Sequence, residues 1–172
     1  EGQIKLFAGQ VFVADNIKEV IPEFLMLLKG VIDCPDLPLN VSRSFLQNDG
    51  YVKKISAHIT KKVADKLNGL MNTERETYEG YWDDIAPFVK YGCIKDSKFH
   101  DMVKGAILMK KTDGKYVTLK EYGEANFEKT GKKIYYTNDE KRQAASVKLY
   151  TDRGIDVAVM NTVIDGNFMS FM

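Results

Sequence analysis

The sequence predicts an α/β fold, because strand-like and helix-like segments alternate along the chain. Residues 3–14 are rich in β-branched and aromatic residues, which favours a strand. Residues 51–71 repeat apolar side chains every three or four positions, which favours a long amphipathic helix. Residues 133–160 have the pattern strand, helix, strand. We expect the two strands of this βαβ unit to be parallel, with a right-handed crossover.

Composition limits the class of protein. The 172 residues are 44% hydrophobic, which is enough for a globular core. The 25 lysines and arginines nearly balance the 24 acids, so the chain lacks the basic footprint of a nucleic-acid or membrane-surface protein. Cys34 and Cys93 lack the spacing of a disulfide framework or a zinc site. No signal segment opens the chain, and no apolar run reaches the ~18 to 20 residues of a membrane-spanning helix, so we expect a cytoplasmic protein.

The N-terminal elements follow from local patterns. Residues 18–29 place apolar side chains on one face, with Pro22 in the first turn and Gly30 after the last, and predict a helix that covers the sheet. Pro35 and Pro38 stiffen an extended loop before the next helix. We expect that helix to bury one face and expose five lysines. The apolar positions are Val52, Ile55, Ile59, Val63, Leu67 and Leu70, and the lysines are Lys53, Lys54, Lys61, Lys62 and Lys66.

The middle of the chain is expected to be helical. A capping box at residues 73–76 predicts a helix to about residue 89, and Ser97 predicts the start of another that runs to about residue 109. Residues 73–110 are therefore expected to hold helices alone. A short strand at residues 116–119 follows, and a second capping box, at residues 118–121, starts a helix to about residue 128.

The βαβ unit closes the sequence. We expect a strand at residues 133–136, a helix opened by Thr137-x-x-Glu140 and closed by Gly154, and a strand at residues 155–160. The first turn has neither GxGxxG nor a P-loop, so we interpret the unit as structural, with a ligand or partner surface as the alternative. The strand-like apolar end and a first residue that is not methionine suggest a piece of a longer protein.

Most residues with catalytic potential have ordinary explanations. His58 and His100 belong to no HExxH or GxSxG pattern, and the acids Asp83 and Asp84 fit a solvated helix face. The aromatic residues at positions 78–88 are expected to be mostly core, with a partner-binding patch around Trp82 as the alternative. We expect neither a catalytic base nor a metal site.

Arg43 is the exception. If Asn40 caps the helix, Arg43 occupies the third helical position, where Glu or Gln would complete a capping box. A guanidinium beside free N–H groups at a helix start can bind a phosphate, and Gln47 lies one turn further along the same face. The alternative is a surface ion pair of Arg43 with Asp36 or Asp49.

The stretch DLPLNVSRSFLQ, with IPEF at residues 21–24 and KGVID at residues 29–33, closely resembles the middle domain of the heat-shock protein 90 chaperone family. LKEY at residues 119–122 and GIDV at residues 154–157 are similar to the same family, so the resemblance covers the whole chain. Two departures are Ser44, where the family usually has glutamate, and residues 147–150, which lack the usual Ser-Pro-Phe.

The resemblance implies α/β/α layered segments joined by a helical connector, ending in a small βαβ unit. The boundaries that the sequence pattern indicates near residues 72 and 110 agree with it: the C-terminal part of the large α/β segment at residues 1–72, the connector at residues 73–110 and a small α/β/α segment at residues 111–172. It implies a homodimeric, ATP-driven chaperone parent that acts in the stress response on unfolded clients, with cochaperones. The parent would bind ATP and magnesium in a separate N-terminal domain, and this fragment alone would not be an enzyme.

In that family the arginine matching Arg43 reaches the γ-phosphate of ATP when the N-terminal domain docks. The residues matching Asn40 and Gln47 support the loop. Two rival functions remain: a pure interaction module for clients or cochaperones, and a free-standing enzyme for a phosphate ligand. The second rival lacks a nucleophile or base beside the arginine.

Overall fold

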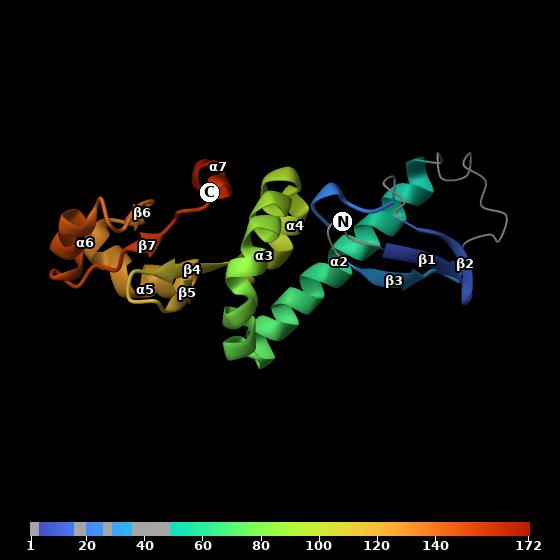
Figure 1. The fold of residues 1–172 in the computed structure, drawn as a ribbon, viewed down its shortest axis with the longest axis horizontal. Coiled ribbons are helices and arrows are strands. Elements are labelled where there is room, and N and C mark those ends of the chain that lie inside the picture. Colours follow the sequence, from blue (N-terminus) through green and yellow to red (C-terminus); the bar gives the residue numbers. More distant parts are fainter. Residues whose placement is uncertain (1–3, 16–19, 26–28, 36–48) are drawn as a thin grey trace. The chain divides into compact units, whose positions relative to one another are not determined.

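The computed structural model describes residues 4–15, 20–25, 29–35 and 49–172 (Figure 1). The chain divides into two compact units, Glu1–Asp65 and Lys66–Met172. Each unit has its own sheet, and both mix helices with strands. The α/β fold class expected from the sequence is therefore confirmed.

The first unit is built on a three-stranded sheet in the order β2-β1-β3. The strands are β1 (Ile4–Ala8), β2 (Val11–Asp15) and β3 (Gly30–Asp33). β1 pairs antiparallel with β2 and parallel with β3. Helix α2 (Asp49–Thr73) begins in this unit, where it runs beside the sheet and buries Ile55 and Ile59 (Figure 1). The expected exposure of its five lysines is also confirmed.

Two predictions for this unit are corrected. The single strand expected at residues 3–14 is a hairpin, because Gly9 and Gln10 have φ of 56° and 71° and form a two-residue turn of the left-handed kind. Within the helix expected at residues 18–29, the described residues form only a 3-10 helix, Glu23–Leu25. Pro22 has no N–H and disfavours helical backbone in the residue before it, so the turn begins after it.

The second unit opens with α3 (Arg75–Lys95) and α4 (Ser97–Val103), followed by a 3-10 helix, Lys104–Ala106. The expected capping box at residues 73–76 does not form, since the Thr73 hydroxyl donates to the Gly69 carbonyl in the last turn of α2. α4 is capped by Asp96 rather than Ser97, because the Asp96 carboxylate accepts the N–H groups of Lys98 and Phe99.

A four-stranded sheet in the order β5-β4-β7-β6 follows. Its elements are β4 (Leu108–Lys111), β5 (Tyr116–Thr118), α5 (Leu119–Thr130), β6 (Tyr136–Thr137), α6 (Ala144–Thr151), β7 (Ala158–Val159) and α7 (Val163–Phe171). The core of this sheet is made of Met109, Tyr122, Ala158 and Met160. Strand β4 corrects the helix expected to reach residue 109, since Leu108 and Met109 are buried and pair with β5.

The parallel pairing predicted for the βαβ unit is confirmed, and the bounds of its elements are corrected. β6 and β7 are parallel, as expected. The helix starts at residue 144 instead of 138 because the Thr137 hydroxyl binds Asp139 N and the Gln143 side chain, which makes a turn there. Gly154 ends the helical region with φ of 67°. The end of the chain, expected to be strand-like, is helix α7, which buries Phe168 in the second unit.

Candidate functional site

The three residues predicted to form a phosphate-directed site, Asn40, Arg43 and Gln47, lie within residues 36–48, outside the described residues. The structure describes only what flanks them. Before them, Cys34 N donates to Phe7 O at 2.9 Å, and Asp33 Oδ2 accepts the N–H of Gln10 at 3.1 Å. The chain entering the arginine segment is thus tied to the β1–β2 hairpin.

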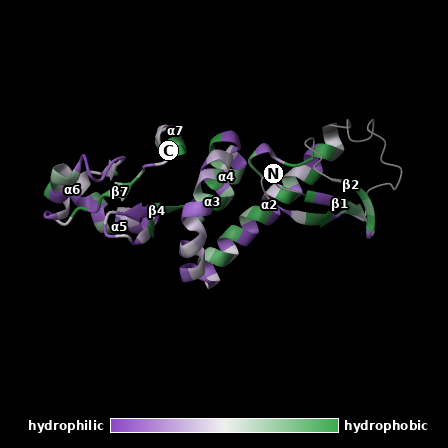
Figure 2. Cartoon of the chain, in the orientation of Figure 1, coloured by the Kyte–Doolittle hydropathy of each residue, from purple (hydrophilic) through white to green (hydrophobic). Residues whose placement is uncertain are grey.

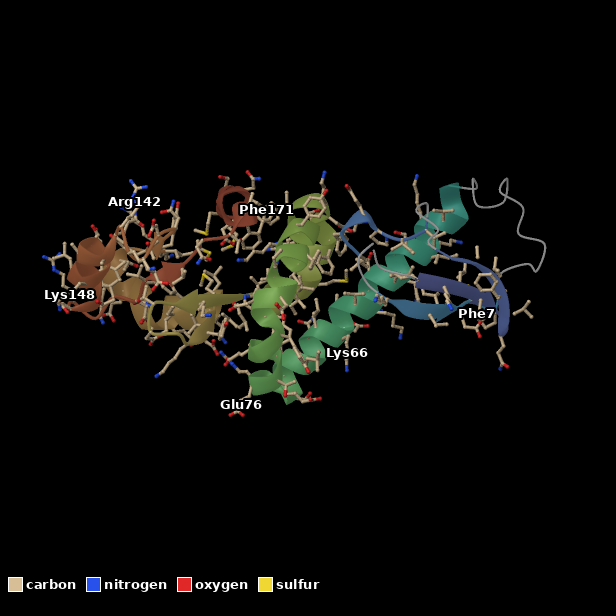
Figure 3. The ribbon with its side chains drawn as sticks, in the orientation of Figure 1. Phe7, Lys66, Glu76, Arg142, Lys148 and Phe171 are labelled. Carbon is tan, nitrogen blue, oxygen red and sulfur yellow. The ribbon has the colours of Figure 1, made fainter. Side chains whose placement is uncertain are left out.

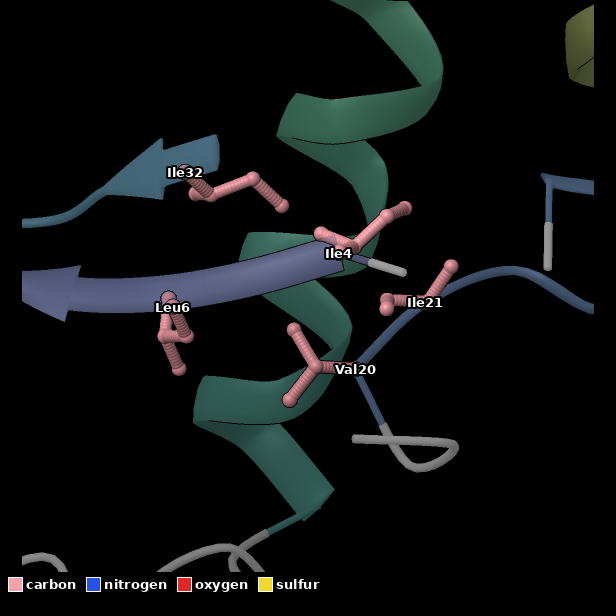
Figure 4. Close-up of a pocket in the computed structure, with 5 residues that line it drawn as sticks. All are labelled: Ile4, Leu6, Val20, Ile21 and Ile32. Atoms are coloured by element: carbon pink, nitrogen blue, oxygen red, sulfur yellow. The ribbon is translucent and has the colours of Figure 1, made fainter. Parts of the chain in front are cut away.

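The described residues at the sheet of the first unit line a gap that is too small for a ligand. A gap of about 10 Å³ is lined by Ile4, Leu6, Val20, Ile21 and Ile32. Figure 4 shows these five aliphatic side chains grouped around β1. The volume is about that of one water-sized probe, and an apolar lining gives a water no partner. The gap is therefore an imperfection of packing.

Groups suited to acid–base or metal chemistry are not assembled in the described part of the chain. His58 is exposed, and the His100 ring packs edge-on against Phe171 with centroids 5.0 Å apart. Within the described residues no group of three or more His, Cys, Asp or Glu side chains could hold a metal ion. In that same part, no helix is long and apolar enough to cross a bilayer.

The aromatic residues of α3 divide between core and surface. Tyr78 and Trp82 are buried, and the Tyr78 hydroxyl donates to the Ala106 carbonyl at 2.8 Å. Tyr81 and Phe88 are exposed, so the expectation that most of these four aromatic residues lie in the core holds for only two of them. Because Trp82 is buried, it offers no partner-binding patch.

Burial raises the pKa of Cys93, also on α3, to about 12, which keeps this thiol protonated and unreactive at neutral pH.

A buried ion pair joins α3 to α7. Lys90 Nζ lies 2.5 Å from Asp165 Oδ1, with both side chains at least nine-tenths buried, and 5.9 Å from the centroid of the Phe168 ring. Sequence reasoning missed this pair. The available signals were a lysine beside the buried residues Val89 and Cys93 on α3, and an acid in the pattern Thr162-x-x-Asp165, which is a capping box in the structure.

A second ion cluster links α3 to α5 and is partly exposed. The Arg75 guanidinium donates to both oxygens of Glu121 and to Glu79. Glu121 also completes the capping box of α5, since it accepts the N–H of Thr118 at 2.8 Å. The hydrogen bond from Arg75 holds the pKa of Glu121 down at about 2. The cluster therefore contributes to stability only while Glu121 is ionised.

The pH dependence of Glu121 has a defined sign. Its folded-state pKa lies below the ordinary value of 4.5, so the contribution is present above that pH and is lost as the pH falls toward 2. Because the Glu121 side chain is 37% exposed, solvent screens its ion pair, and we expect it to contribute only about 1 kcal/mol to the free energy of unfolding. Urea denaturation should show that Glu121→Gln, which keeps the cap, loses this amount at pH 6.5 and almost none near pH 2.5. Glu124→Gln, the control on the same helix, should lose less than about 0.5 kcal/mol at either pH, and a pH-independent loss at Glu121 would contradict the assignment.

The fold and the surroundings of the arginine segment define a mixed α/β domain of two compact units, whose described residues include no group of His, Cys, Asp or Glu side chains that could hold a metal ion. Residues 1–172 match the family described as Hsp90 protein. The chain belongs to the Hsp90 family.

Relatives and a solved structure agree with this assignment. The chain is 41% identical to the chaperone protein HtpG of Porphyromonas gingivalis, over 99% of this chain and 26% of that protein. It is 38% identical to HtpG of Bacteroides thetaiotaomicron, over 100% of this chain and 26% of that protein. It therefore spans about a quarter of these relatives. The middle domain of a Plasmodium falciparum heat shock protein matches with a TM-score of 0.71 at 23% identity, covering 98% of this chain and 66% of that one, and shares the fold.

Proposed function

We propose that this chain is the middle-domain part of an ATP-dependent chaperone, and that Arg43 reaches the γ-phosphate of ATP bound in a separate N-terminal domain. The observation that carries the proposal is the family match over residues 1–172, which includes DLPLNVSRSFLQ with its arginine at the predicted helix start. In this proposal Asn40 and Gln47 support the arginine segment as neutral hydrogen-bonding groups.

The chemistry suits an arginine supplied by one domain to a nucleotide held by another. Guanidinium presents several donors in a fixed fork and stays charged at any working pH. It can neutralise charge that develops on the transferred phosphoryl group, an effect of ~10³ to 10⁵ in rate for arginine fingers in GTPases.

The rest of the proposal follows from the family. The parent would bind ATP with magnesium in its N-terminal domain, act as a cytoplasmic homodimer and bind unfolded clients with cochaperones. Its middle domain would comprise the large segment, connector and small segment expected at residues 1–72, 73–110 and 111–172. The chain alone would hydrolyse no ATP.

The test joins this chain to a separately produced N-terminal nucleotide-binding domain of the parent and measures ATP turnover. We expect the chain to raise turnover and Arg43→Ala to remove the increase. Arg43→Lys should restore only part of it, because lysine keeps the charge and loses the fork. The matched control is Arg153→Ala, which replaces an exposed arginine in the second unit and should stimulate turnover as much as the unsubstituted chain does.

The rival functions give different results in the same assays. Equal stimulation by Arg43→Ala and by the unsubstituted chain would overturn the role of Arg43 and favour a pure interaction module. Specific heat of binding when ATP and magnesium are titrated into the isolated chain would favour a free-standing phosphate-binding enzyme. We expect none.

A further inference from the structure

Helix α6 is the crossover helix of the βαβ unit, and it packs loosely. None of its eight residues is buried, although Val147, Leu149 and Tyr150 are apolar. A crossover helix ordinarily buries an apolar stripe against its sheet. Leu149 is 50% exposed, and Val147 and Tyr150 are only partly buried. The apolar side chains of α6 therefore lack part of the packing that they could make.

The missing packing corresponds to a cavity. A space of about 200 Å³ is lined by residues of α6 and β6 and by Val157, the residue before β7. Its lining includes Tyr135, Tyr136, Val147 and Tyr150, and the rings of Tyr135 and Tyr150 form one wall with centroids 4.5 Å apart. Sites for drug-sized ligands typically have ~300 to 1,000 Å³. The cavity therefore has room for one large side chain, and its aromatic wall suits an aromatic one.

The cavity also has polar groups without partners. Gln143 and Ser146 line it, and both residues are exposed. The Gln143 carbonyl oxygen accepts a hydrogen bond from the Thr137 hydroxyl at 2.5 Å. In the described part of the chain, neither the Gln143 amide nitrogen nor the Ser146 hydroxyl has a hydrogen-bond partner. Both can donate to a carbonyl or carboxylate at the cavity, as expected of a site that orients a polar chain around an apolar anchor.

The surroundings of the cavity are positively charged. Residues 129–155 contain seven lysines and arginines and three acids, in a chain of net charge +1. Asp139 accepts the backbone N–H groups of Lys141 and Arg142, and Asp152 pairs with Lys148. Lys141 and Arg142 directly precede Gln143 and have no ion pair within the described residues. Figure 3 shows the Arg142 side chain directed away from the fold, and Figure 2 shows mainly hydrophilic loops around α6.

We propose that the cavity beneath α6 binds a partner peptide that inserts one aromatic side chain against Tyr135 and Tyr150. Carboxylates on either side of that aromatic residue lie against Arg142 and Lys141. The charge of the region selects an acidic peptide, and the size of the cavity limits the anchor to one side chain. A nucleotide is a poorer fit, because the turn between β6 and α6 contains no glycine that would let the backbone enclose a phosphate. This site is independent of the proposed role of Arg43.

The test titrates three unlabelled peptides into the isolated chain, labelled with ¹⁵N, and follows the chemical shifts of the chain. The probe is Gly-Ser-Glu-Glu-Phe-Glu-Glu-Ser-Gly, the second peptide has alanine in place of phenylalanine, and the third has glutamine in place of each glutamate. We expect the probe to bind with a Kd between about 10 µM and 1 mM, as for a small interface. The shifts should move at Gln143, Ser146 and Tyr150. The alanine peptide should bind at least about 30-fold more weakly, and binding of the glutamine peptide should weaken about fivefold or more.

Two variants test the site from the side of the protein. Ser146→Phe places a ring in the cavity from an exposed helix position, so it should block the probe while leaving the fold intact. Arg142→Glu should weaken binding about fivefold, whereas Lys98→Glu, an exposed lysine on α4 with the same change of charge, should have little effect. Equal binding by the alanine peptide, or undiminished binding by Ser146→Phe, would overturn the proposal. Absence of binding by the probe would do the same.

Discussion

Replacing Lys90 with methionine is expected to lower the free energy of unfolding by about 3 to 5 kcal/mol. The substitution leaves the Asp165 carboxylate in a site where its side chain is 3% exposed, without the ammonium that lies 2.5 Å away in the parent chain. Asp165 would keep one hydrogen bond, from the N–H of Thr162 at 2.9 Å. That hydrogen bond compensates for neither the lost counter-charge nor the water that a carboxylate has around it in the unfolded chain. The loss of stability therefore comes from the contact between α3 and α7. Urea denaturation followed by the fluorescence of Trp82, which lies in α3, measures it.

The double variant Lys90→Met/Asp165→Asn separates charge from packing. Asparagine keeps an acceptor for the Thr162 N–H and removes the charge that methionine leaves unpaired. We expect the double variant to recover most of the loss, because an unpaired buried charge costs more than the net contribution of a buried pair. Lys104→Met, which breaks an exposed pair with Asp101 at 3.7 Å, should cost less than about 1 kcal/mol. A Lys90→Met variant within that same range would contradict the assignment.

Asn126→Asp is the second large effect that we expect, with a loss of about 3 kcal/mol at pH 7.5. Asn126 is 1% exposed, and its amide nitrogen donates to Asp156 Oδ2 at 3.0 Å, while its oxygen accepts the Asp156 N–H at 2.8 Å. Aspartate has nearly the same shape and keeps the second bond. It replaces the first with two carboxylates in contact, and Lys111, 3.0 Å from Asp156, can offset only one of the two charges.

The repulsion between the two carboxylates predicts how the loss of stability varies with pH. Two adjacent carboxylates can share one proton, so the difference between Asn126→Asp and the parent chain should shrink as the solution is acidified from pH 7.5 to 5. Denaturant titrations at several pH values would record this trend. The control is Asn161→Asp at an exposed position just before α7, which should change stability by less than about 0.5 kcal/mol. A loss at Asn126 that stays constant over this pH range would contradict the repulsion.

Local patterns predicted the elements whose signals lie within one segment. The long helix at residues 51–71 is α2, which extends two residues further at each end, because its apolar period alone decides its form. The capping box at residues 118–121 starts α5 as expected, since both of its hydrogen bonds are local. The parallel pairing of β6 and β7 followed from the order strand, helix, strand.

The errors arose where a distant contact competes with a local preference. Leu108 and Met109 continue a helical pattern in the sequence, but pairing with β5 makes them a strand. Thr73 matches a capping residue, yet its hydroxyl bonds the preceding helix instead. The apolar end of the chain has a strand-like composition and forms a helix, held to α3 by the buried pair of Lys90 and Asp165.

The sequence by itself determined the α/β class, the family and the residue to test, Arg43, because motifs and periodic patterns are properties of neighbouring residues. Only the tertiary structure decided that Lys90 meets Asp165, which lies 75 residues further along the chain, and that a cavity separates α6 from its sheet. Both depend on which surfaces pack together. Packing is set by the summed volumes and charges of residues from distant segments, and no single stretch of sequence encodes that sum.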